Sequence, residues 1–106
     1  MKITVESVFS IQFGRIHFQV IGDLYLNGEL MAWIGFMSKT ELEAEPGENT
    51  IEIFFENAMK EKTKIKFYAT KDVHIFVRIV KRNLFSEKFN IETLVKGKDL
   101  KIIEES

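Results

Sequence analysis

The chain has 106 residues, 45% of them hydrophobic and 29% charged, with a formal net charge of −1 and no cysteine. This length and mixture are typical of one globular domain, residues 1–106, and the missing cysteines exclude disulfides and thiolate zinc sites. Fifteen basic residues balance sixteen acidic ones, so net charge gives no reason to expect nucleic acid or anionic lipid as a partner.

The first predicted strand lies near the N-terminus. Apolar residues take most odd positions from Ile3 to Phe13, the period-two pattern of a half-buried strand. After Gly14 the apolar residues move to even positions, from Ile16 to Val20, so we expect a turn or bulge at Gly14.

The strongest local signal is the pair Asn27-Gly28, because these two residue types accept the positive φ angles of a type I′ hairpin turn. A two-residue loop would place Leu24 opposite Met31. The predicted arrangement then gathers on one face Leu24, Leu26, Met31 and Trp33, and on the other Tyr25 and Leu30.

A short strand is predicted from Ser38 towards the Pro46-Gly47 turn, although Ser38 to Glu41 also matches a helix-capping box. Residues 50–56 and 62–68 then alternate so regularly that a register follows, with Ile51 opposite Phe67. The predicted register also pairs Ile53 with Ile65, Phe55 with Thr63, Glu52 with Lys66 and Glu56 with Lys62. A third strand over 73–80 completes a predicted three-stranded meander.

The last part of the chain contains a segment that fits two structures. Residues 89–95 alternate as a strand, whereas Ser86 and Gly97 could cap a short helix; we favour the strand. A final strand from Leu100 to Ile103 and a solvated tail, residues 104–106, follow. About eight short strands predict an all-β fold, an antiparallel β-sandwich of immunoglobulin-like or jelly-roll-like form, with an OB-like barrel as the alternative.

The outward face of the predicted meander interleaves aromatic and basic residues. It either packs against another sheet, which makes its aromatic residues core, or stays exposed as a platform for bases, sugars or a protein. We favour packing. The candidate contact residues are Trp33, Phe54, Lys64, Lys66, Tyr68, Phe76 and Arg78.

We find no pattern that predicts catalysis. His17 and His74 fall on different predicted strands, and no Gly-x-Ser-x-Gly motif or phosphate-binding loop is present. Glu41, Glu43 and Glu45 alternate as a solvated strand face rather than a calcium loop. We therefore expect no enzyme, no cofactor and no metal.

The sequence predicts a non-catalytic interaction module that binds another protein or its own copy, through the aromatic face or by adding a strand to an open sheet edge. A single-stranded nucleic-acid-binding domain and a carbohydrate-binding module are the alternatives. The apolar stretches are shorter than the roughly 20 residues of a spanning helix, and no signal segment is seen. We expect a cytoplasmic protein, although removal of an export signal would leave the same sequence.

Two turns carry a resemblance to a known family. The hairpin from Leu24 to Leu30, the following Gly35, and the stretch Pro46-Gly47-Glu48-Asn49-Thr50-Ile51 are similar to PEGA-type domains and other small bacterial β-sandwich modules. The resemblance covers roughly thirty residues. It implies an accessory or cell-surface interaction domain that has no catalytic residues.

Overall fold

A computed structural model describes residues 1–11, 22–35, 38–55, 61–81 and 90–106. These residues form strands and turns and contain no helix. The nine strands are β1 (Lys2–Ile11), β2 (Gly22–Leu26), β3 (Glu29–Ile34), β4 (Ser38–Glu43), β5 (Gly47–Phe55), β6 (Glu61–Ala69), β7 (Val73–Lys81), β8 (Asn90–Gly97) and β9 (Lys101–Glu105).

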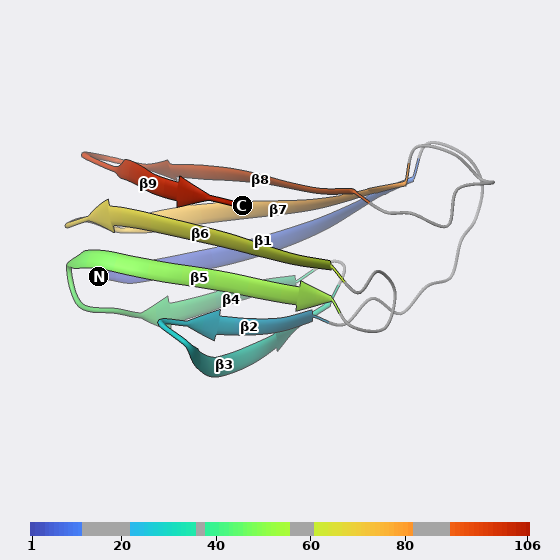
Figure 1. Cartoon of the computed structure of the whole chain (residues 1–106), viewed down its shortest axis with the longest axis horizontal. Helices are drawn as coiled ribbons and strands as arrows, with labels where there is room; N and C mark the ends of the chain where they lie inside the picture. The colour runs from blue at the N-terminus through green and yellow to red at the C-terminus, as the bar shows by residue number, and fades with distance from the viewer. Residues whose placement is uncertain (12–21, 36–37, 56–60, 82–89) are drawn as a thin grey trace.

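The strands form two sheets that face each other as layers (Figure 1). One sheet has four strands in the order β4-β1-β7-β8, and the other has five in the order β3-β2-β5-β6-β9. The predicted all-β sandwich is confirmed, and two separate sheets replace the alternative of one barrel. The sandwich is not wholly antiparallel, because β1 pairs in parallel with β7.

The core lies between the two sheets and is built by the inward positions of each strand. Period-two alternation sends every second side chain inward, and these inward residues are mainly Ile, Val and Leu. Each such side chain that is fully buried contributes about 1.5–3 kcal/mol to folding. The largest fully buried side chains are Ile3, Val5, Leu24, Ile34, Ile51, Ile53, Ile65, Phe67 and Ile75.

The predicted three-stranded meander is wrong in its third strand. β5 and β6 pair as expected, but β7 lies in the four-stranded sheet between β1 and β8. Alternation in β7 fixes which side chains point inward, but it does not fix which sheet the strand joins. The chain crosses between the sheets at residues 70–72, and the backbone N–H of Lys2 donates to Asp72 Oδ1 there, at 2.8 Å.

The register of β5 and β6 differs from the predicted one by two residues. Ile51 faces Ile65 and Ile53 faces Thr63, so the predicted pairing of Ile51 with Phe67 is wrong. A shift of two leaves the same residues inward, and Ile51, Ile65 and Phe67 are all buried as expected. The predicted partners Phe55 and Thr63, and Glu52 and Lys66, are likewise displaced by the same step.

The Asn27-Gly28 turn is confirmed, because φ is 51° at Asn27 and 85° at Gly28. Beyond the turn, a bulge lies opposite Leu24 and Tyr25, so that Leu24 pairs with Ala32 rather than with Met31. This extra residue shifts the parity of β3. The predicted grouping of Met31 and Trp33 on one face with Leu24 is therefore wrong, because Leu24 is buried and both of these residues are exposed.

More of the C-terminal region forms strands than the sequence predicts. Residues 90–97 form strand β8, which confirms the choice of strand over helix. The predicted tail is wrong, because Glu104 and Glu105 belong to β9 and Ser106 exchanges two backbone hydrogen bonds with Lys64, at 2.8 and 2.9 Å. The expected turn at Gly14, His17 and the Glu56 pairing lie outside the described residues.

Candidate interaction surfaces

The structure divides the predicted contact residues between two surfaces that point away from each other. Phe76 and Arg78 lie on the outward face of the four-stranded sheet, because they belong to β7. The other five lie on strands of the five-stranded sheet: Trp33, Phe54, Lys64, Lys66 and Tyr68. The candidate residues therefore share no single face, either as a packed surface or as an exposed platform.

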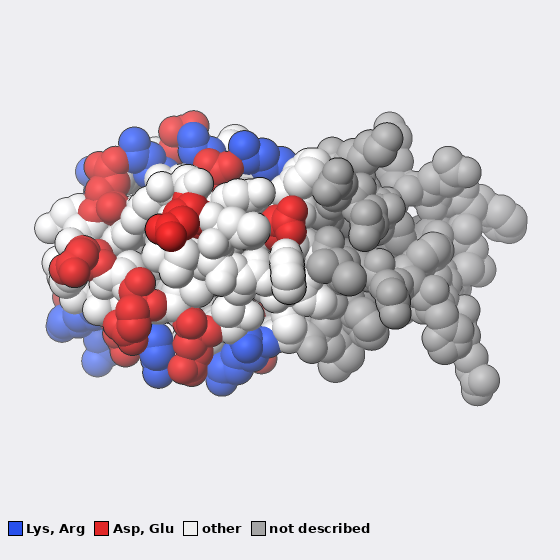
Figure 2. All heavy atoms as spheres, turned by 90° about the horizontal axis from the view of Figure 1, so that it is seen from below, with Lys and Arg blue, Asp and Glu red and all other residues white. Residues whose placement is uncertain are grey.

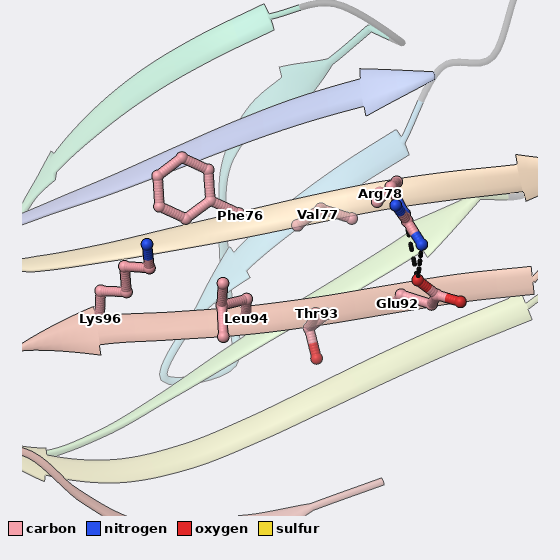
Figure 3. A pocket seen from close by; sticks show the side chains of 7 residues that line it. All are labelled: Phe76, Val77, Arg78, Glu92, Thr93, Leu94 and Lys96. Carbon is pink, nitrogen blue, oxygen red and sulfur yellow. Dashed lines mark hydrogen bonds and ion pairs between the residues drawn. The ribbon is translucent and has the colours of Figure 1, made fainter. Parts of the chain in front are cut away.

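The outward face of β7 and β8 carries a shallow groove of about 400 Å³ (Figure 3). Phe76 and Leu94 supply its apolar surface, and the Lys96 ammonium lies 5.5 Å from the centre of the Phe76 ring. At its other end Arg78 Nε donates to Glu92 Oε2 at 3.1 Å. The groove is therefore apolar in the middle and ionic at both ends.

A histidine and a glutamate adjoin this groove. His74 Nε2 lies 2.9 Å from Glu6 Oε2, and the His74 ring stacks on Phe76 with ring centres 4.0 Å apart. These contacts hold Phe76 in place and make it half-buried. No group of three or more His, Asp or Glu residues that could hold a metal occurs in the described ranges.

The basic residues on the outward face of the five-stranded sheet are largely engaged by acidic neighbours. Lys62 Nζ lies 2.7 Å from Glu52 Oε2, and Lys66 Nζ lies 2.9 Å from Glu48 Oε1. The hydrogen bond from Lys66 to Glu48 and the negative charge of that carboxylate raise the pKa of Lys66 above its ordinary value. The positive charges of Lys62 and Lys66 are therefore balanced by glutamates of the same sheet, which makes them less available to an anionic ligand.

The most exposed apolar surface lies on β3, at one end of the five-stranded sheet. Trp33 is 74% exposed, Leu30 48% and Met31 43%. Sequence reasoning identified Trp33 but missed Leu30 and Met31 as contact residues. Leu30 pairs with Tyr25 as the predicted turn requires, but the bulge that exposes Met31 depends on how β2 and β3 pair, and no sequence pattern used above could locate it.

The backbone of β3 is also open on one side. Within the described residues β3 pairs with β2 alone, so one row of its N–H and C=O groups lacks a strand partner. Proteins commonly protect such edges with lysine or proline, but β3 has the sequence ELMAWI and contains neither. An apolar strand edge of this kind is suited to pairing with another strand.

Charge is unevenly distributed along the chain, between the part that contains β2 to β5 and the part that contains β6 to β9. Residues 22–35 and 38–55 hold seven acidic residues and one basic residue, whereas 61–81 and 90–106 hold nine basic and six acidic ones. Figure 2 views the side on which β3 lies in Figure 1: its middle is largely uncharged with a few acidic side chains and no Lys or Arg, which lie at the margins together with further acidic side chains. The β3 edge is thus apolar and has acidic surroundings.

Comparisons with protein-family models, with curated proteins and with solved structures find no significant match to this chain. The similarity to PEGA-type domains therefore stays a prediction. In the described part of the chain, no helix has the length and apolar character that crossing a membrane requires.

Proposed function

We propose that this protein is a non-catalytic interaction module that binds an extended polypeptide segment as an added strand at β3. The observation that carries the proposal is the 74% exposure of Trp33 on an edge strand, next to exposed Leu30 and Met31. Contiguous exposed apolar patches often mark interaction sites, whereas single exposed apolar residues are common on protein surfaces.

Strand addition divides the work of binding between backbone and side chains. The open row of β3 backbone groups supplies hydrogen bonds, and alternate side chains of the incoming strand provide specificity. Trp33 would serve as an aromatic anchor, since tryptophan is enriched among the residues that dominate binding energy. The acidic surroundings favour an incoming apolar segment with a basic residue beside Glu29 at the start of β3, because opposite charges steer association.

The alternative functions receive less support from the geometry. Stacking of bases or sugars needs neighbouring aromatic residues on one surface, but Tyr68 pairs with Glu48, far along β5 from Phe54, and Phe76 belongs to the other sheet. Lys66 and Arg78, which such a platform would present to a phosphate backbone, each pair with a glutamate. A cytoplasmic location and the absence of catalysis stay predictions.

The test is selection from a displayed library of random ten-residue peptides. We expect the selected peptides to be apolar with a basic residue near one end, and to lose at least tenfold in affinity when backbone N-methylation removes their strand hydrogen-bond donors. Binding is measured by fluorescence anisotropy of labelled peptide.

Two variants locate the site. Trp33→Ser should weaken binding at least tenfold, whereas Leu94→Ser, a change at a 54% exposed residue on β8, should leave it unchanged. Selected peptides that bind Trp33→Ser as tightly as the parent protein would rule out the β3 edge as the site.

A further inference from the structure

The five-stranded sheet has two edge strands, and both carry exposed apolar side chains. β3 forms one end and β9 the other, and within the described residues neither has a strand partner on its outer side. On β9, Ile102 is 39% exposed and Ile103 is 46% exposed. The molecule therefore presents two open edges of the same sheet, each with apolar side chains that lack cover.

The two edges also run in the same direction. Four antiparallel pairings separate β3 from β9, so their chain directions agree, as the arrows in Figure 1 show. A second copy displaced along the sheet, without being turned over, would bring its β9 alongside β3 as a parallel pair. This protein already forms one parallel pair, between β1 and β7.

The charges of the two strands favour a parallel contact between β3 of one copy and β9 of another. β3 lies in the acidic part of the chain and carries Glu29 at its start, whereas β9, whose sequence is KIIEE, has Lys101 at its start and Glu104 and Glu105 at its end. In a parallel pair of β3 with β9, Glu104 and Glu105 lie beside the uncharged end of β3, whereas an antiparallel pair would place them beside Glu29, which is unfavourable. In a parallel pair, Glu29 at the start of β3 and Lys101 at the start of β9 lie towards the same end.

We propose that the strand β3 receives is β9 of a second copy of this chain, so that copies join head to tail and continue the five-stranded sheet across molecules. This inference rests on the proposed function, because it requires β3 to accept a strand. Such a contact uses different surfaces on the two partners and does not close on itself unless the copies form a ring. The assembly therefore grows with concentration instead of stopping at a dimer.

The test uses two variants that each block one edge with a charge: Met31→Lys on β3 and Ile103→Lys on β9. Sedimentation velocity should show the parent protein growing in mass with concentration and each variant alone as a monomer. An equimolar mixture of the two should form a dimer, since each partner keeps the edge that the other lacks. Leu94→Lys, on the four-stranded sheet, is the matched control and should grow like the parent.

Both substituted side chains are exposed, and circular dichroism and thermal unfolding would check that each variant folds. A parent protein that stays monomeric, or a mixture that does, overturns the inference. A dimer of Ile103→Lys alone also overturns it, because that variant retains only the β3 edge. Peptide selection on Ile103→Lys separates the two proposals: bound peptides with a monomeric mixture would leave the proposed function standing and the self-assembly rejected.

Discussion

β7 and β3 have similar apolar character but opposite surroundings. β7 lies inside the four-stranded sheet, and its inward residues Val73, Ile75 and Val77 are at most 2% exposed. β3 ends the five-stranded sheet, and Trp33, its largest residue, is mostly exposed. The comparison teaches that the face on which a side chain lies decides its burial even on an edge strand: Ile34 of β3 points inward and is 0% exposed, whereas Trp33 points outward and remains available for binding.

The largest predicted effect on stability comes from a substitution in the buried face of β7. Ile75→Ala should lower the free energy of unfolding by about 2–5 kcal/mol, because it removes buried methyl groups and leaves a cavity between the sheets. Chemical denaturation monitored by circular dichroism gives the value. Trp33→Ser is the matched change on β3 and should shift stability by no more than about 0.5 kcal/mol. Equal losses in the two variants would mean that β3 packs as core.

A second prediction concerns how the β2–β3 hairpin is fastened to the core. Asn49 on β5 is 3% exposed; its Oδ1 accepts a hydrogen bond from Asn27 Nδ2, and its Nδ2 donates to the Glu45 carbonyl, both at 2.9 Å. Asn49→Ala removes both hydrogen bonds and should cost about 1–3 kcal/mol, since each typical intramolecular hydrogen bond contributes about 0.5–1.5 kcal/mol. Amide hydrogen exchange should also quicken in the hairpin. Unchanged exchange there would show that the turn needs no such link.

Some of this architecture was readable from the sequence because it depends on local chemistry. The Asn27-Gly28 turn follows from two residues that accept positive φ, and the inward faces of β5 and β6 follow from alternation. The prediction of the inward faces of β5 and β6 holds despite the error of two residues in their register, since a shift of two keeps each side chain on its face. Local rules therefore sufficed for the fold class.

The candidate site was less predictable because it depends on non-local pairing. Nothing between β6 and β7 marks a crossing to the other sheet, and that crossing separates Tyr68 from Phe76. The bulge in the β2–β3 pairing reverses Met31 and Trp33, and it arises from the fit of two strands rather than from either sequence. Sequence reasoning thus found Trp33 as a contact residue but placed it on the wrong face.

A third, smaller prediction tests the turn that starts β3. Gly28 has a φ of 85°, and Gly28→Ala should cost about 1–2 kcal/mol through backbone strain, although the space around its Cβ position is empty. Gly35→Ala is the control, because it also has open space but no left-handed φ. It should be neutral or stabilising by less than about 1 kcal/mol. Thermal unfolding of the two variants, if indistinguishable, would contradict the strained turn.

The smallest predicted effect lies on the outward face of the five-stranded sheet. Glu48→Gln removes the carboxylate that raises the pKa of Lys66, so this pKa should fall towards its ordinary value of 10.5 in an NMR titration of the Lys66 side chain. Since the folded-state pKa is the higher one, the pair stabilises the protein below pH 10.5 and loses that effect as pH rises through the raised pKa. Lys66 is exposed to solvent screening, so the unfolding midpoint should hardly change at neutral pH. The same substitution should leave peptide binding at β3 intact, because Glu48 lies on β5 and contacts β6; weaker binding would show that the interface extends across the sheet.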